Sequence, residues 1–267
     1  MAILSISELT TFRWTFEEDV RQLAAAEIPA IGVWRQKLSD FGEEKGIELL
    51  REYGLQVSSL HWAGGFTGSD GRSHQESVCD ARDAMQLAVE LDTRVLTLYS
   101  GSRSGHTHKH ARRLLRSALD VLLPFAEEHN VCLALEPMHS GCASEWTFLT
   151  TLEETLQLVS ECGSPHLQIA FDTYHLGHDS DHWNGLEDCI DSISIVHLGD
   201  ARCTPKGEQS RYPLGAGTLP LYDMLAALRA HGYRGYFEVE LMGEEIEACD
   251  YVELLANSKR AFAQLVG

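Results

Sequence analysis

The stretch VCLALEPMH, residues 131–139, contains the pattern that decides the fold: a short apolar run that ends on a charged residue. The pattern recurs in LQIAFD at 167–172, ISIVHL at 193–198 and YFEVEL at 236–241. Each run is almost continuously apolar, which is typical of a parallel strand covered on both faces. The four runs therefore predict four strands of a parallel sheet.

Four similar runs precede these: LSISEL near residue 4, AIGVW at 30–34, QVSSLHW at 56–62 and RVLTLY at 94–99. Amphipathic segments separate them, and FEEDVRQLAAAEI, for example, places apolar residues at helical spacing. An open doubly wound sheet usually has a glycine-rich first turn, whereas TTFRWTF follows the first run here.

Eight alternations in one chain favour a closed barrel. We therefore predict an α/β fold in which residues 1–267 form a single (β/α)₈ TIM-barrel domain, with the active site at the C-terminal ends of the strands. Pro124, inside the long helical segment RLLRSALDVLLPFAEEH, predicts a kink or a break there.

Composition limits the partners of this protein. The formal net charge is −19 and the pI is about 5.0, which disfavours binding to nucleic acid or to anionic membranes. The seven cysteines include no C-x-x-C pair, as expected for reduced thiols in the cytoplasm. No signal peptide or membrane span is evident, so we expect a cytoplasmic protein, and a homo-oligomer is left open.

Charged residues end the last four runs. They are Glu136, Asp172, His197 and either Glu238 or Glu240. Strand parity does not choose between the two glutamates, because alternate residues share a face, and we prefer Glu240 because it is nearer the carboxyl end. In a barrel these ends converge, and the carboxylates would repel one another without a cation. One divalent metal resolves this, with Mn²⁺ or Mg²⁺ favoured and Zn²⁺, Co²⁺ or Fe²⁺ also suited.

The motifs at these strand ends together resemble the xylose-isomerase-like TIM barrels, the sugar phosphate isomerase/epimerase superfamily. They are ALEPMH, FDTYHLG, VHLGDAR and GYRGYFEVEL, and the resemblance covers nearly the whole chain and is densest from 131 to 243. It implies one divalent metal on Glu136, Asp172, His197 and Glu240, with His175 beside the metal or in contact with substrate. It also implies that the two glutamates act as catalytic acid and base on opposite faces of a sugar.

The chemistry of such a site is consistent with this role. A metal chelated by a carbonyl oxygen and a neighbouring hydroxyl acidifies a carbon-bound proton, and one carboxylate then removes it to give a metal-stabilised enediolate. A second carboxylate returns a proton. We therefore predict a metal-dependent isomerase or epimerase acting on a small-molecule sugar, a ketose or a relative of one, with Glu136 and Glu240 catalytic.

Residues at other strand ends are candidates for substrate contacts. His61, Trp34 and Arg35 follow or end earlier strands, and an aromatic wall with His and Arg donors suits a polyhydroxylated ligand. Arg202, Lys206 and Arg211 lie in the loop after the seventh run, before LGAG at 214–217. Backbone donors and cations in that loop suit a phosphate, as barrels often use loops after strands seven and eight, but a solvated turn is the simpler interpretation.

Three alternatives stay open. A metal-dependent keto-cyclitol dehydratase, similar to inosose dehydratase, would share the metal and the proton abstraction. A DNA-repair nuclease similar to endonuclease IV is disfavoured, because its three zinc ions need a His after strand four and an Asp-x-His after strand seven, where this chain has LTLYSGS and DARCTPKG. A non-enzymatic sugar-binding barrel would not need both glutamates. Asp200 is the one obvious ligand for a second metal, so we favour a single ion.

Overall fold

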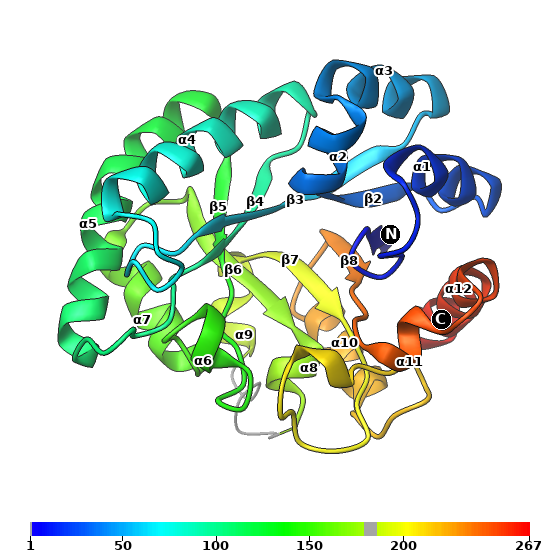
Figure 1. The fold of residues 1–267 in the computed structure, drawn as a ribbon. Helices are drawn as coiled ribbons and strands as arrows, with labels where there is room; N and C mark the ends of the chain where they lie inside the picture. The colour runs from blue at the N-terminus through cyan, green and yellow to red at the C-terminus, as the bar shows by residue number, and fades with distance from the viewer. Residues whose placement is uncertain (1, 179–185) are drawn as a thin grey trace.

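A closed barrel of eight parallel strands forms the centre of the computed structural model, which describes residues 2–178 and 186–267 (Figure 1). Neighbouring strands follow one another in chain order, and β1 pairs with β8 to close the ring. The prediction of a single (β/α)₈ TIM barrel is confirmed. The strands are β1 Ile3–Ser7, β2 Ala30–Trp34, β3 Gln56–Gly64, β4 Val95–Tyr99, β5 Cys132–Leu135, β6 Leu167–Asp172, β7 Ile193–Leu198 and β8 Tyr236–Val239.

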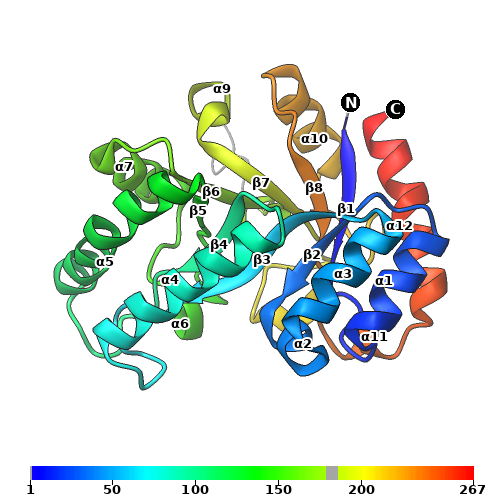
Figure 2. The ribbon, with the colours of Figure 1, turned by 90° about the horizontal axis from the view of Figure 1, so that it is seen from above.

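Helices surround the barrel on its outside, and the C-terminal helix α12 lies beside the first strand (Figures 1 and 2). The described helices are α1 Phe16–Ala25, α2 Arg35–Phe41, α3 Glu43–Tyr53, α4 His74–Glu90, α5 His108–His129, α6 Ala143–Trp146, α7 Leu152–Cys162, α8 Thr173–Leu176, α9 Leu186–Cys189, α10 Leu221–Ala230, α11 Glu244–Glu247 and α12 Tyr251–Val266, with short 3₁₀ turns at Ile190–Ser192 and Glu208–Ser210.

Side-chain caps fix where several of these helices begin. The Ser73 hydroxyl accepts a hydrogen bond from the Glu76 backbone N–H at the start of α4, and the Glu76 carboxylate accepts one in return from the Ser73 N–H. Thr151 accepts from the Glu154 N–H at the start of α7. Pro124 lies inside α5, which runs on to His129, so the residue does not break the helix.

The main apolar core lies between the strands and the helices. Phe16 of α1, Leu38 of α2 and Leu225 of α10 are buried in it against outward-facing strand residues such as Ile31 and Leu98. The burial of this layer provides the main driving force for the fold. In the part of the chain that the structure describes, no helix is long and apolar enough to cross a membrane.

The inside of the barrel changes character along its axis. Val95, Ala134, Ala170 and Ile195 form a small buried apolar cluster. Two residues further along each of these strands come Thr97, Glu136, Asp172 and His197, which are all buried. Since alternate strand residues share a face, these polar side chains also point into the barrel, one layer closer to the carboxyl ends. The fold therefore concentrates charge inside the mouth of the barrel.

Candidate metal and active site

Glu136, Asp172, His197 and Glu240 meet in this polar layer. They come from four consecutive strands: Glu136 directly follows β5, Asp172 ends β6, His197 lies in β7 and Glu240 directly follows β8. The strand register sets Asp172 beside His197, and the Glu240 N–H donates to the Leu198 carbonyl. One nitrogen or carboxylate oxygen from each of the four residues lies within 4.8 Å of the others, and each side chain is at most 1% exposed.

Most polar atoms of this group have no hydrogen-bond partner among the described residues. They include both carboxylate oxygens of Glu136, both of Glu240 and both ring nitrogens of His197. His197 Nδ1 lies 3.5 Å from Glu136 Oε1 and 3.8 Å from Glu240 Oε2. A buried polar atom without a partner is costly, and a cation at this place would take carboxylate oxygens of Glu136 and Glu240 and one ring nitrogen of His197 as ligands. The donor set therefore fits the divalent metal that the sequence predicts.

Arg211 adds a fixed positive charge to the site. Its guanidinium lies 2.7 Å from Asp172 Oδ2, 2.9 Å from Glu208 Oε2 and 3.4 Å from Glu240 Oε1. The side chain is fully buried and lies over the Tyr174 ring, 4.5 Å from its centre. A buried guanidinium bonded to several carboxylates holds their orientations, and here it holds Asp172 from the side of the loop that follows β7.

The close charges shift the pKa values of the group. Burial would raise the pKa of Asp172, but Arg211, His175 and His197 lower it below its ordinary value. Burial opposes a charge on His197, but Glu240 and Glu136 raise the pKa of its imidazole to about 10. Burial raises the pKa of Glu240. Desolvation and charge coupling thus act together on these residues, as is common at functional sites.

His175, which the resemblance places beside the metal or the substrate, lies in α8 directly after Asp172. Its Nε2 is 3.8 Å from Asp172 Oδ2, 4.0 Å from Glu136 Oε1 and 3.4 Å from Glu208 Oε1. Together with Cys142 and Glu208 it forms a second group with the spacing of metal ligands. Burial and Glu208 raise the pKa of the Cys142 thiol to about 12, however, and a neutral thiol is a poor ligand.

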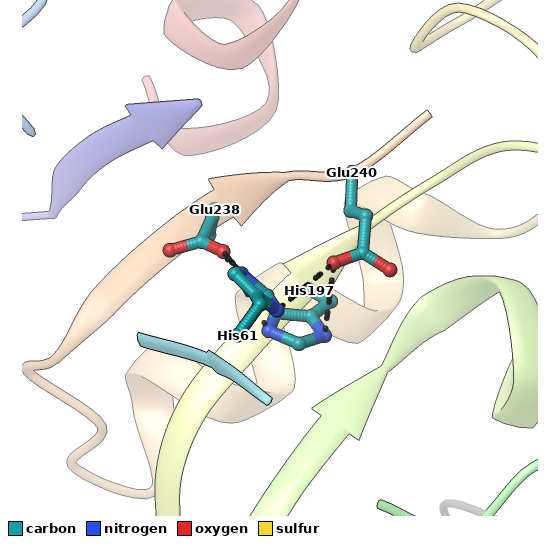
Figure 3. Close-up of side chains that lie close together, drawn as sticks. All are labelled: His61, His197, Glu238 and Glu240. Carbon is teal, nitrogen blue, oxygen red and sulfur yellow. Dashed lines mark hydrogen bonds and ion pairs between the residues drawn. The ribbon is translucent and has the colours of Figure 1, made fainter. Parts of the chain in front are cut away.

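His61 lies deeper than the sequence predicts. Instead of ending β3 at the mouth, it is completely buried, with Nε2 hydrogen-bonded to Glu238 Oε1 at 2.6 Å and Nδ1 3.7 Å from Glu240 Oε2. The reason is that β3 continues to Gly64, past the predicted end of the strand at Trp62. In Figure 3 the rings of His61 and His197 lie between the carboxyl groups of Glu238 and Glu240.

An aromatic row lies beside the site. Trp34 stacks on Trp62 with ring centres 6.3 Å apart, and Trp62 contacts Tyr99 at 5.8 Å. Burial, and then the charges of Glu136 and Glu240, raise the pKa of Tyr99 above its ordinary value. Trp34, Trp62 and His61 line part of a cavity of about 340 Å³.

Arg35 lines the same cavity, but its guanidinium is engaged by the protein. It donates to both carboxylate oxygens of Asp80, at 2.9 and 3.2 Å, and to the Trp62 carbonyl at 3.1 Å. Arg72 also lies 3.0 Å from Asp80. The structure thus places Trp34, Arg35 and His61 around one cavity, and Arg35 also donates a hydrogen bond to the Trp62 backbone.

Arg202 is not brought into the charged group. Its side chain is exposed, donates to the Ala216 carbonyl at 3.0 Å and lies over the Tyr212 ring. The backbone donors of the LGAG segment are also engaged: the N–H groups of Gly215 and Gly217 donate to Asp200 Oδ2, at 3.0 and 2.9 Å. Asp200 thus occupies the position at which we considered a phosphate, and the second-metal role considered for it has no support in these contacts.

Sequence reasoning overlooked two members of the site. Glu208 was not singled out, and Arg211 was considered only as a cation for phosphate binding. The 3₁₀ turn Glu208–Ser210 places Glu208 and Arg211 close enough to bond to each other at 2.9 Å, and Arg211 also reaches Asp172, one of the predicted metal ligands. The sequence offered one signal, the spacing of three residues between Glu208 and Arg211. An irregular loop has no periodicity, however, so the sequence does not predict toward which side of the barrel these side chains point.

Comparisons with known proteins agree with this geometry. The family model described as a xylose isomerase-like TIM barrel matches residues 20–262. Over 232 residues the chain is 25% identical to a D-psicose 3-epimerase of Enterocloster bolteae, in an alignment that covers 81% of this chain and 70% of that protein. It is 24% identical over 226 residues to the L-ribulose-5-phosphate 3-epimerase UlaE of Shigella flexneri serotype 5b, covering 78% and 75% of the two chains.

A solved structure extends the likeness to the full length. Protein SMc04130 from Sinorhizobium meliloti 1021 is 26% identical and superposes with a TM-score of 0.91, covering 98% of each chain. The family model spans most of the chain, and the sequence motifs, the barrel and the four-residue metal group all agree with it. The chain belongs to the xylose isomerase-like TIM barrel family.

Proposed function

We propose that this protein is a divalent-metal-dependent sugar epimerase that inverts carbon 3 of a ketose by removing a proton and returning it on the opposite face. The observation that carries the proposal is the buried group of Glu136, Asp172, His197 and Glu240, whose unpartnered oxygens and nitrogens converge at the carboxyl ends of four strands. The curated relatives are both named 3-epimerases of ketoses or their phosphates, which supports the choice of reaction and of carbon.

Glu136, Asp172, His197 and Glu240 would hold the metal, with Mn²⁺ or Mg²⁺ best suited to three carboxylates and one imidazole. When bound, the cation acts as a Lewis acid toward a substrate carbonyl and its neighbouring hydroxyl. Arg211 keeps Asp172 oriented through its 2.7 Å bond. The deep burial of the group excludes water, which strengthens the electrostatic interactions made there.

Glu136 and Glu240 are the proposed catalytic residues. They leave different strands, β5 and β8, and face the same space from two sides. One carboxylate takes the proton from carbon 3, and the electron pair of that C–H bond moves toward the neighbouring carbonyl to form an enediolate. The other delivers a proton to carbon 3 from the opposite face and so inverts that carbon. No atom is lost, and no oxidant or reductant is consumed.

We propose that the substrate is an unphosphorylated ketose. Asp200 already accepts hydrogen bonds from the N–H groups of the LGAG segment, where a barrel often binds phosphate. The loop after β8 leads into α11, whose first turn carries Glu244, Glu245 and Glu247, and these charges repel a phosphate. The aromatic row of Trp34, Trp62 and Tyr99 instead offers apolar faces to the C–H groups of a sugar.

A product assay on purified protein tests the reaction. The chain is stripped of metal with a chelator, reloaded with Mn²⁺ or Mg²⁺ and incubated with ketohexoses, ketopentoses and keto-cyclitols, and the products are separated by chromatography. The proposal predicts interconversion of ketoses that differ only at carbon 3. Loss of water from a keto-cyclitol with no epimerised ketose would instead identify a dehydratase, and no reaction across the panel would contradict the proposal.

A further inference from the structure

We infer that Glu238 is a positioning residue that orients the imidazoles of His197 and His61 at the proposed metal site. The inference rests on the proposed metal site, in which Glu238 is not a ligand. Glu238 lies on β8 two residues before Glu240, and both side chains point into the barrel (Figure 3).

The carboxylate of Glu238 is fully supplied with hydrogen-bond donors, unlike those of Glu136 and Glu240. The Ser58 hydroxyl donates to Oε2, the Ser59 hydroxyl donates to Oε2 at 2.9 Å, and His61 Nε2 lies 2.6 Å from Oε1. The oxygens of Glu136 and Glu240 have no such partners among the described residues. A carboxylate whose lone pairs are already used is suited to orient its neighbours rather than to bind a cation.

The two ring nitrogens of His197 face opposite carboxylates. Nδ1 faces Glu136 and Glu240, the proposed ligands, whereas Nε2 lies 3.8 Å from Glu238 Oε1. A ring that gives its Nδ1 lone pair to a cation keeps its proton on Nε2, and that proton then needs an acceptor. Glu238 is the carboxylate on that side of the ring, and a small shift would bring the pair to hydrogen-bond distance.

His61 connects the same carboxylate to a second ligand. Its Nε2 is bonded to Glu238, and its Nδ1 lies 3.7 Å from Glu240 Oε2. The rings of His61 and His197 are 5.3 Å apart. By fixing His61, Glu238 therefore also limits where the carboxylate of Glu240 can lie. One carboxylate beneath the site thus acts on two of the four proposed ligands.

The barrel is built to hold Glu238 at this position. Gly32 of β2 faces its carboxyl group, and a Cβ at that position would collide with it. Ser58 is held in turn by Ser5 of β1, with the two hydroxyl oxygens 2.6 Å apart. Gly32 of β2 therefore provides space for this side chain, β3 provides its donors and β1 supports one of them, an arrangement that a charge without a role would not need.

Metal affinity tests the inference without any sugar. Cobalt(II) is titrated into the metal-free full chain in competition with a chelating dye, and the visible absorption bands of the bound ion report its coordination. Because partners of metal ligands typically contribute about 10- to 100-fold in affinity, we expect Glu238→Gln to bind Co²⁺ weaker by that factor with unchanged bands. Ser59→Ala, which removes one donor to Glu238, should show a smaller loss in the same direction.

A matched control separates this effect from the loss of any buried carboxylate. Glu8 is as buried as Glu238 but accepts its hydrogen bond from the Trp34 N–H, away from the metal group, so Glu8→Gln should keep wild-type affinity. If Glu238→Gln does not fold, the Co²⁺ affinity of Ser59→Ala still tests the inference. Wild-type affinity in these variants of Glu238 and Ser59 would overturn the inference.

Two further results would also overturn it. Cobalt bands of Glu238→Gln that change as they do in Asp172→Asn would make Glu238 a ligand within the group of His61, His197, Glu238 and Glu240, which is also spaced for a metal. Wild-type protein that binds no cobalt would overturn both the inference and the metal site. Protein that binds cobalt as described but epimerises no ketose would overturn the proposed function alone.

Discussion

Nη1 of Arg211 lies 2.7 Å from Oδ2 of Asp172, so a loop residue after β7 is joined to a proposed metal ligand at the end of β6. The guanidinium is buried among carboxylates, which raise the pKa of Arg211 well above its ordinary value although burial opposes this. The arginine is therefore a permanent cation. It links the ordering of the loop that follows β7 to the geometry of the metal group.

Replacing Arg211 should destabilise the protein most when metal is removed. Removing one partner of a buried ion pair costs about 3–5 kcal/mol, because the other charge is left uncompensated. Arg211→Met should therefore unfold at a much lower denaturant concentration than wild type when a chelator is present. Saturating Mn²⁺ should restore part of the loss by neutralising the same carboxylates. Urea unfolding curves with and without metal measure both effects.

The exposed Arg202 of the same loop provides the control for this experiment. Arg202→Met should change the free energy of unfolding little, since exposed charges contribute little. Equal losses for Arg202→Met and Arg211→Met would contradict the role assigned to the Arg211–Asp172 contact.

Asp200 should prove structural and not a ligand to metal. Its carboxylate accepts from the N–H groups of Gly215, Gly217 and Leu219 and so shapes the loop after β7. Asp200→Ala should lower the free energy of unfolding by about 1–3 kcal/mol, because it leaves those N–H groups unsatisfied, and should leave metal stoichiometry unchanged. Asp83→Ala, an exposed change on α4, is the control. A halved metal content in Asp200→Ala would indicate a second metal.

The protein should prefer a free ketose to its phosphate. Asp200 fills the position considered for a phosphate, and the first turn of α11 carries three glutamates. We therefore expect kcat/KM for a ketose to exceed that for the matching ketose phosphate by about tenfold or more, the size of one unfavourable charge contact. Steady-state kinetics on both substrates, at one ionic strength, gives the ratio. A preference for the phosphate would show that the loop after β7 rearranges to bind it.

Stability in acid should depend on Asp80, which holds Arg35 beside the aromatic row. Burial raises the pKa of Asp80, but Arg35 and Arg72 lower it below the ordinary 3.8. The pKa of Asp80 is therefore lower in the folded protein than in the unfolded chain. Its ionised carboxylate stabilises the fold at a pH above the unfolded pKa, and this stabilisation is lost as the pH falls through the folded pKa. The difference in unfolding free energy between wild type and Asp80→Asn should therefore shrink as the pH falls below 3.8.

The pH experiment has its control on the same helix. Asp83 is exposed on α4, and Asp83→Asn should give a curve parallel to that of wild type at all pH values. If Asp80→Asn kept a constant offset from wild type down to the lowest pH, the two arginines would not be stabilising the ionised carboxylate.

The sequence predicts the position of a site residue well where that residue lies in a regular strand, and poorly where it lies in a loop. Asp172 and His197 end or nearly end regular strands, so the apolar runs before them located both side chains at the barrel mouth. Glu240 was chosen over Glu238 by its depth along the strand, in agreement with the family resemblance, and in the structure Glu238 lies one layer lower, bonded to His61. For Asp172 and His197, period and parity were sufficient because β-strands alternate strictly, whereas the choice of Glu240 also needed its depth along the strand.

The rest depended on information that periodicity does not carry. The depth of His61 follows from a shift in strand register between Leu60 and Ala63 and from two further residues of β3, neither of which a hydrophobic pattern reveals. Arg211 and Glu208 reach the site from an irregular loop. Arg202, also in that loop, lies on the outside although its residue type is the same. Loop direction is set by contacts such as those of Asp200, which form only after folding.

Deuterium exchange from solvent tests the central claim most directly. Metal-loaded protein in D₂O is incubated with a ketose that it epimerises, and NMR locates the incorporated deuterium. We predict deuterium at carbon 3, no incorporation after chelation, and a loss of about 100-fold or more in Glu136→Gln and Glu240→Gln, the usual contribution of a general acid or base. Exchange that survives the chelator, or that continues at the full rate in either glutamine variant, would contradict proton transfer by these two glutamates at a metal site.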